Sequence, residues 1–245
     1  MKFYIRHWYS LNLIVALVLI VYLALSFESL ATVQVLVLLN FIALIFHQFE
    51  EYGFPGGEPM IMNYVLQKSD IPDRFPLNQF SAMFTNVPVA WTFYGIAFFF
   101  PDVIWLCLAP MVFNIGQLIV HGVATNKAMK SIYNPGLFSV VFLHLPISIY
   151  FVWFVYSQDL IVGIDWLWAI LMAMFCGGFL VGFLTYAVFA NRDSHRSFAP
   201  VEMERFNVKE KLTAKGIVIE AGNGASKGPF AIMQKIQRKL HGDKL

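Results

Sequence analysis

The pentapeptide His47-Gln48-Phe49-Glu50-Glu51 places one imidazole and two carboxylates at the end of a long apolar run. On a helix, residues three and four positions apart lie on one face, so His47, Glu50 and Glu51 are expected to converge. Asn40, two turns earlier, falls on the same side as His47. Ionisable side chains within a hydrocarbon-compatible segment cost free energy and mark functional sites. This stretch is therefore the first candidate for a reactive centre.

A later apolar run contains a second polar set, because Asn114, Gln117 and His121 fall at positions i, i+3 and i+7 of one helix face. When both helices run in the same direction, His47 and His121 lie at similar depth near the same membrane surface. Imidazole and carboxylate are ligands that suit Zn, Fe or Mn. The two runs together therefore predict a shared metal site.

We predict that His47, Glu51 and His121 bind a divalent metal ion, Zn or Fe, in a site with open coordination positions. Glu50 then acts as general base toward metal-bound water, whose pKa falls to about 7 in such sites. The roles of Glu50 and Glu51 can be exchanged, because a helix offers either carboxylate to a metal bound at His47. The alternative is a structural polar network that fastens two helices. A second buried carboxylate makes that alternative less favourable, because like charges repel unless a cation neutralises them.

Two further features follow the second polar run. Tyr133-Asn134-Pro135-Gly136 is a strong turn signal. It is interpreted either as a plain connection between helices or as a turn from which Tyr133 or Asn134 reaches the site. His144 is interpreted either as a further ligand or as a histidine that is hydrogen-bonded within the bundle.

The composition is that of a membrane protein. Of the 245 residues, 58% are hydrophobic and only 13% are charged, with a mean hydropathy of +0.64, whereas soluble domains are about 45–50% apolar and about 25% charged. Cys107 and Cys176 both lie inside apolar runs, so neither a disulfide framework nor a cysteine metal site is expected. No NAD, flavin or haem motif is visible, and residues 216–228 lack the spacing of a phosphate-binding loop. The expected partner is the lipid bilayer, and not nucleic acid.

Six runs are long enough to cross a bilayer, which takes about 20 mainly apolar residues. Short links after the first and third runs predict antiparallel hairpins. The predicted fold is therefore all-α, a polytopic bundle of six transmembrane helices. The runs cover residues 10–27, 31–50, 86–100, 103–125, 137–157 and 165–190.

The basic residues predict the orientation of this bundle. With six spans, the N-terminus, two of the connections (51–85 and 126–136) and the chain after residue 191 lie on one side, and these segments contain all 17 Lys and Arg. On the opposite side, the charged residues are all acidic, namely Glu28, Asp102, Asp159 and Asp165. Because Lys and Arg favour cytoplasmic loops, both termini are predicted to be cytoplasmic, with the protein in the cell (inner) membrane.

The chain divides into a membrane domain, residues 1–191, and a basic cytoplasmic tail, residues 192–245, that is partly disordered or lies on the membrane surface. Within the 51–85 connection, a short amphipathic segment is expected to lie in the interface or cap the site, or to be an ordinary surface helix. Its apolar positions are Met60, Ile61, Tyr64 and Val65. The tail has an apolar stripe beside basic residues, a pattern typical of a helix on anionic lipid. The stripe consists of Phe230, Met233, Ile236 and Leu240.

The motifs resemble those of the HXXEE-domain family, multi-pass membrane proteins of uncharacterised function. The resemblance rests on His47-x-x-Glu50-Glu51, on Asn114 seven residues before His121, and on Tyr-Asn-Pro-Gly, and it extends over about residues 15–190. The family pattern has an Asn four residues before the later histidine, where this chain has Gln117. Because the resemblance implies no established activity, the chemistry predicted here depends on the residues themselves.

These features favour a metal-dependent intramembrane enzyme, most simply a hydrolase that acts on a lipid-like or membrane-embedded amide or ester. With iron in the site, the reaction would shift toward oxidation. The alternatives are an ion- or proton-coupled transporter and a structural scaffold whose tail is the functional part. For an enzyme within the bundle, deletion of residues 195–245 is expected to leave activity intact.

Overall fold

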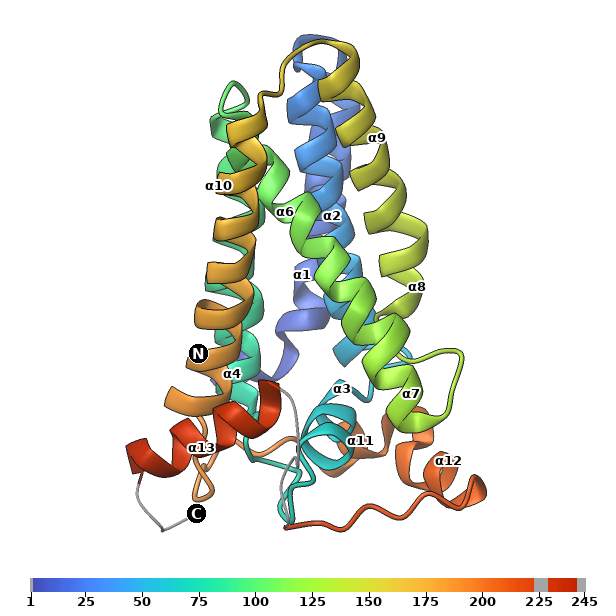
Figure 1. Cartoon of the computed structure of the whole chain (residues 1–245). Coiled ribbons are helices and arrows are strands. Elements are labelled where there is room, and N and C mark those ends of the chain that lie inside the picture. Colours follow the sequence, from blue (N-terminus) through green and yellow to red (C-terminus); the bar gives the residue numbers. More distant parts are fainter. Residues whose placement is uncertain (1, 223–228, 242–245) are drawn as a thin grey trace.

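The computed structural model describes residues 2–222 and 229–241, and its regular elements in that part of the chain are all helices. Six of them are long and apolar enough to cross a membrane, which confirms the predicted all-α bundle (Figure 1). They cover Lys2–Ser29, Thr32–Tyr52, Gln79–Phe99, Ile104–Met129, Leu137–Ser157 and Gly163–Val188.

Most of these long helices contain changes of helical pitch. The first two consist of α1 (Lys2–Ser26), η1 (Phe27–Ser29) and α2 (Thr32–Tyr52). The third consists of α4 (Gln79–Phe84), η3 (Thr85–Val89), α5 (Ala90–Gly95) and η4 (Ile96–Phe99). The fourth consists of α6 (Ile104–Gln117), η5 (Leu118–Thr125) and α7 (Asn126–Met129). The last two consist of α8 (Leu137–Ser139), η6 (Val140–His144), α9 (Leu145–Ser157), α10 (Gly163–Met174) and η7 (Phe175–Val188).

The third long helix begins at residue 79, seven residues before the predicted start at 86. The side chain of Asn78 caps it by accepting hydrogen bonds from the backbone N–H groups of Phe80 and Ser81. Its first turns are polar, which kept them below the hydropathy expected of a span. The Gln79 side chain donates to Glu202 in the tail, and Ser81 is fully buried. The polar start is therefore buried by protein contacts.

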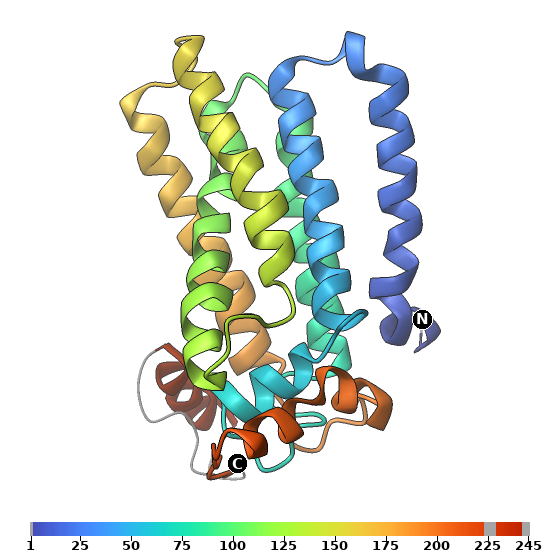
Figure 2. The ribbon, with the colours of Figure 1, turned by 90° about the vertical axis from the view of Figure 1, so that its right-hand side faces the viewer.

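Helix α2 lies at the centre of the bundle and α1 at its edge. In the most apolar part of each helix, 67% of the residues are buried in α2 but only 11% in α1. Helix α2 contacts α1, α5, α6 and α9, whereas α1 stands beside α2 at the rim (Figure 2). The central position of α2 places the polar residues at its end inside the protein.

The base-rich end of the bundle is covered by the 51–85 connection and by part of the tail. The covering elements are α3 (Glu58–Met60), η2 (Ile61–Leu66), α11 (Pro200–Glu204), η8 (Arg205–Asn207) and α12 (Val208–Ala214). We call these five elements the cap. Its apolar side chains share one cluster with the inner ends of α1 and α2, which contains Trp8, Tyr52, Met60, Ile61, Val65, Phe198, Met203, Val208 and Leu212. The segment predicted around Met60 therefore covers the bundle end. The boundary predicted between residues 191 and 192 stays a prediction.

The remaining tail helix, α13 (Pro229–His241), lies across the bundle end and packs against η7 (Figure 1). In the predicted apolar stripe, Leu240 is exposed and Ile236 is partly buried, while the side chains of Phe230 and Met233 lie outside the described residues. Residues 223–228, the second half of the glycine-rich stretch, also lie outside them.

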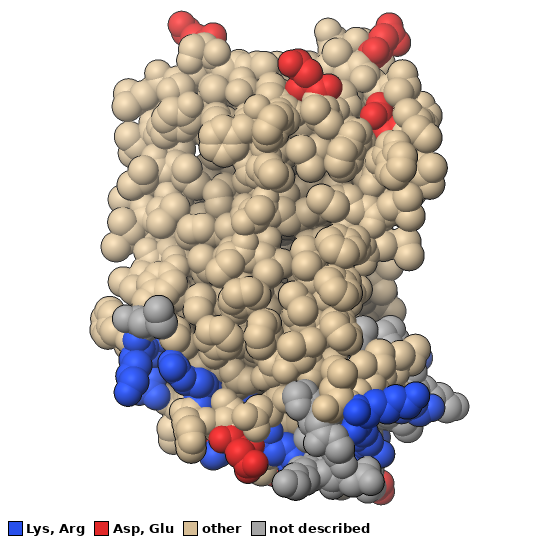
Figure 3. Space-filling view, turned by 90° about the vertical axis from the view of Figure 1, so that its left-hand side faces the viewer, with Lys and Arg blue, Asp and Glu red and all other residues tan. Residues whose placement is uncertain are grey.

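Charge divides the molecule along the bundle axis. Lys and Arg gather at one end, and the charged residues visible at the other end are all acidic (Figure 3). Figure 1 places α13, the last described element of the tail, toward the base-rich end. This arrangement agrees with the predicted distribution of charge, and it puts the final turn of α2 near the base-rich surface.

Candidate metal centre

Two histidines and one glutamate from different parts of the bundle converge at the inner end of α2. Nε2 of His47 lies 3.4 Å from Oε1 of Glu51, and Nε2 of His121 lies 3.3 Å from the same oxygen. All three donor atoms lie within 4.8 Å of one another. The exposed fractions of His47, Glu51 and His121 are 2%, 8% and 1%. We call these three residues the donor triad; they are the residues predicted as metal ligands, and they form a possible metal site.

The hydrogen bonds of both histidines fix the orientation of their rings. Nδ1 of His47 lies 3.1 Å from the carbonyl oxygen of Gly136, and Nδ1 of His121 lies 2.8 Å from Oδ1 of Asn134. The Asn134 amide nitrogen donates to the His121 carbonyl and to Asn126, which identifies Oδ1 as the acceptor. Since these oxygens can only accept, each histidine donates from Nδ1 and keeps a lone pair on Nε2. Metal-binding histidines are held in this way.

The arrangement of the triad suits a cation. Two nitrogen lone pairs and a carboxylate oxygen repel one another in a buried site unless a positive charge lies between them. A shared proton would bring nitrogen and oxygen to about 2.7–2.9 Å, shorter than the 3.3–3.4 Å observed. Zinc bonds of about 2.0–2.1 Å place neighbouring donors about 3.3–3.4 Å apart in a tetrahedral site and about 2.9 Å apart in an octahedral one. The two nitrogen–oxygen separations are therefore compatible with tetrahedral ligands, and the two Nε2 atoms lie within 4.8 Å of each other.

The turn before the fifth long helix supports the triad with three of its four residues. Tyr133 donates its hydroxyl to Oε1 of Glu50 at 2.9 Å, and Asn134 holds His121 as described above. Gly136 accepts from His47 and adopts a positive φ of 97°. A Cβ atom there would lie 2.6 Å from His121 and 2.9 Å from His47, so only glycine fits between the two rings. The Tyr-Asn-Pro-Gly turn is therefore part of the site's support.

Glu50 points to the start of α8 and is not part of the donor triad. Its two oxygens accept from Tyr133, from the backbone N–H groups of Phe138 and Ser139, and from the Ser139 hydroxyl, at 2.6–3.1 Å. A carboxylate is stabilised at the N-terminus of a helix, where N–H groups are free. Burial and the charge of Glu50 raise the pKa of Tyr133, which keeps its hydroxyl as a donor. These contacts join α2 to the fifth long helix.

A second polar layer lies deeper in the bundle, about two turns from the triad. Asn40 accepts from Asn114 at 3.0 Å and from Nδ1 of His144 at 2.8 Å. Asn114 also binds Tyr94 and Ser148. His144 lies with its ring centre 5.6 Å from that of His47, and its Nε2 has no hydrogen-bond partner among the described residues. The structure thus brings Asn40, Asn114 and His144 into one network next to the triad, although His144 is outside the donor group.

Gln117 is the predicted site residue that this network does not include. It is only partly buried, and the structure describes no hydrogen bond of its side chain within the network. The fourth long helix changes to π-helical pitch directly after Gln117, which alters the spacing between Gln117 and His121. A π-helix has more residues per turn than an α-helix, so the spacing i, i+3, i+7 no longer marks a single face.

Two residues near the triad were not found from the sequence. Ser139 contacts both Glu50 and His47, at 2.6 and 2.9 Å, but a lone serine in an apolar helix gives no signal. Glu58 begins α3 and is 6% exposed. Its position after Gly56-Gly57 resembles an ordinary loop acid, and only its burial distinguishes it.

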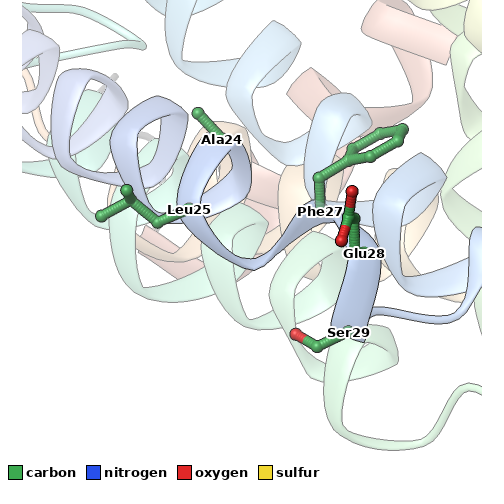
Figure 4. Close-up of a pocket in the computed structure, with 5 residues that line it drawn as sticks. All are labelled: Ala24, Leu25, Phe27, Glu28 and Ser29. Atoms are coloured by element: carbon green, nitrogen blue, oxygen red, sulfur yellow. The ribbon is translucent and has the colours of Figure 1, made fainter.

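The hollow shown in Figure 4 lies at the other end of the molecule, where α1 ends and the chain turns toward α2. Its lining offers one carboxylate, from Glu28, and one hydroxyl, from Ser29, beside apolar side chains. A single carboxylate is not a metal-binding set. This hollow is therefore separate from the donor triad.

Comparison with protein families connects this site to a recurring motif. A family model described as a protein of unknown function with HXXEE motif matches residues 38–151. These residues belong to the HXXEE family. The HXXEE region thus runs from α2 into α9 and contains the donor triad and the supporting turn, which confirms the resemblance over a narrower range than residues 15–190. Comparisons with curated proteins and with solved structures found no match.

Proposed function

We propose that this HXXEE-family protein is a metal-dependent membrane hydrolase in which the donor triad binds Zn²⁺. The observation that supports this proposal most strongly is the geometry of His47, Glu51 and His121. Both nitrogen–oxygen separations are compatible with tetrahedral ligands, and three protein donors would leave one position free, as in catalytic zinc sites, whereas structural zinc sites have four protein ligands. Iron is the other metal considered, because a set of two histidines and one carboxylate also occurs in non-haem iron sites.

The reaction proposed is hydrolysis of an ester or amide. The oxygen of one water molecule bonds to the carbonyl carbon, and one proton of that water passes to a carboxylate. The bond from this carbon to the ester oxygen or amide nitrogen breaks, and the leaving group takes a proton. A zinc ion supplies the polarisation of water that this requires at neutral pH. The four donors on Glu50 support a positioning role for it in place of the general-base role expected from the sequence.

The proposed substrate is lipid-like or membrane-embedded, because the triad is buried within membrane-length helices and covered by the cap. An apolar groove of about 530 Å³ between α1, α2 and the third long helix supports this class. Trp91 lines the groove and donates to Gln48, the neighbour of His47 in the motif. We also propose that the base-rich end faces the cytoplasm, which places the centre near the cytoplasmic surface.

The apolar packing supports an enzyme over a transporter. A transporter needs a polar path that reaches both membrane surfaces. In the half of the bundle away from the triad, the described core is formed by apolar residues, among them Val33, Leu36, Ile104, Leu108 and Val155. The polar network of Asn40 and Asn114 ends against this core, so the arrangement supports a site that opens toward one side.

The test is metal analysis of the full chain purified in detergent. We expect about one zinc per chain, and its loss in His47→Ala, Glu51→Gln and His121→Ala, since each substitution removes a donor. His195→Ala removes an exposed histidine of the tail and is the matched control. Zinc-loaded protein should then hydrolyse a fluorogenic ester or amide lipid in mixed micelles, and a chelator should stop it. Folded wild type that binds neither zinc nor iron would refute the proposal.

A further inference from the structure

Glu58 is a buried carboxyl group without a described counter-charge in contact with it. It is 6% exposed, and its Oε2 has no hydrogen-bond partner among the described residues. It lies outside the membrane-length helices, at the first residue of α3 in the cap. Burying a carboxyl group in this way costs free energy unless the group is hydrogen-bonded or paired with a cation in the functional state. Its position therefore calls for an explanation.

The surroundings of Glu58 are those of the metal centre. Burial raises the pKa of Glu58 well above its usual value, the charge of Glu51 raises it further, and His121 lowers it. The geometry agrees, because the backbone N–H of Gly56 donates to the Glu50 carbonyl at 3.0 Å and α3 contacts α2, so Glu58 starts its helix beside the end of α2 that carries the triad. It is not one of the three residues whose donor atoms lie within 4.8 Å of one another, so it stands behind the ligands.

The backbone around Glu58 is shaped to bring it there. Gly56 and Gly57 precede it with φ of 71° and 104°, values that glycine adopts without strain. A Cβ atom on Gly57 would lie 2.9 Å from the carbonyl oxygen of Arg205 and 2.9 Å from Cβ of Phe206. The side chain of Arg205 donates to the Tyr52 carbonyl at the end of α2. Residues 205 and 206 of the tail therefore pack on the turn, and this packing holds the start of α3 next to the end of α2.

The charges of the centre identify a role for Glu58. A divalent ion with neutral histidines and one Glu51 carboxylate leaves a net charge of about +1 in a buried site, where an unbalanced charge is unfavourable. Glu50 is turned toward the start of α8 and Tyr133 and is not one of the donor triad. Glu202, the other buried carboxyl group of the cap, is paired with Tyr9 and Gln79, whereas Glu58 has an unpartnered oxygen among the described residues.

We propose that Glu58 is an outer residue of the metal centre, whose carboxylate neutralises the excess charge of the bound divalent ion. The inference rests on the metal-dependent function proposed above. Carboxylates behind the ligands orient them and strengthen binding, and their loss weakens metal affinity by about 10–100-fold.

The test is the Zn²⁺ affinity of the full chain in detergent, measured by competition with a chelating dye. Glu58→Gln keeps the size of the side chain and removes its charge, so it should bind Zn²⁺ about 10–100-fold more weakly than wild type. Glu58→Asp keeps the charge and should bind more tightly than Glu58→Gln. The control, Glu204→Gln, changes an exposed acid of the same cap and should bind as wild type does. The metal-free Glu58→Gln protein should be at least as heat-stable as metal-free wild type, because it loses an unpaired carboxyl group.

The outcomes separate this inference from the proposed function. Wild-type affinity in Glu58→Gln, or an equal loss in Glu204→Gln, would overturn the role of Glu58 while leaving the triad intact. Weaker binding in Glu58→Asp than in Glu58→Gln would also overturn it. If wild type itself binds no Zn²⁺, the metal-dependent function fails first.

Discussion

At the scale of single residues, the centre depends on a residue that has no side chain. Gly136 lies between the rings of His47 and His121, and its carbonyl sets the tautomer of one of them. The separation of the two Nε2 atoms is therefore fixed by the absence of a side chain at this position. Preorganisation of this kind is what keeps ligands in place before a metal arrives.

Gly136→Ala is expected to displace the histidine rings, because its Cβ would come within 2.6 Å of His121 and its backbone has a positive φ. Zn²⁺ affinity should fall by about tenfold or more, as it does when ligand orientation is lost. Gly116→Ala is the matched control, because a Cβ there meets no atom within 4 Å. Dye competition in detergent measures both variants, and equal affinities for the two would contradict this account.

The sequence was sufficient to predict the triad but not its surroundings. His47, Glu51 and His121 could be found because helical spacing and span direction place them at one depth. Glu58 could not, because its approach to the triad depends on Arg205 and Phe206, nearly 150 residues later. The change to π-helical pitch directly after Gln117 also has no simple sequence signal.

At the scale of elements, the decisive junction joins the end of α2 to the start of α8. The adjacent residues Glu50 and Glu51 make different contacts there. Glu51 faces the histidines, while Glu50 accepts the free N–H groups of the next helix. One carboxylate therefore serves metal binding in our proposal, and the other fastens two helices.

Glu50→Gln and Glu51→Gln should consequently behave differently. Glu50→Gln is expected to lower the free energy of unfolding by roughly 2–3 kcal/mol, since a hydrogen bond to an ionised group contributes about 1.5–3 kcal/mol. Glu51→Gln should leave the metal-free protein about as stable as wild type and abolish zinc binding. Denaturation of both metal-free variants in detergent provides the comparison. A Glu50→Gln protein with unchanged stability would favour the general-base role.

The six long helices were predictable because hydropathy reports burial in lipid or protein alike. The start of the third helix at residue 79 was not, because its polar first turn pairs with Glu202 of the tail. Hydropathy counts such a side chain as solvent-exposed, whereas tertiary contacts bury it. The same limitation applies to the tail. Its composition is that of a polar extension, yet several of its side chains are buried against the bundle.

At the scale of the whole molecule, the cap closes the base-rich end of the bundle over the centre. Phe198, Met203, Val208 and Leu212 are buried in the same cluster as Trp8 and Tyr52. Phe206 also packs edge-on against Tyr133, the residue that holds Glu50. The tail is thus part of the structure around the triad, and its removal should affect the bundle site.

A chain that ends after residue 197 should lose bound zinc to a chelator about ten times faster than the full chain, because it lacks these buried side chains and Arg205. A chain that ends after residue 222 keeps α11 and α12 and should behave like the full protein. The rate of zinc transfer to a chelating dye measures the difference. Equal rates in all three chains would support the earlier expectation that the bundle works without residues 195–245.

The order in which a ribosome makes this chain gives the cap a further consequence. The last member of the triad, His121, precedes the last buried cap residue, Leu212, by about 90 residues. At synthesis rates of about 5–20 residues per second, this interval lasts roughly 5–20 s. During biogenesis the ligands are therefore present before their cover, and an ion can enter the centre before the cap has been made.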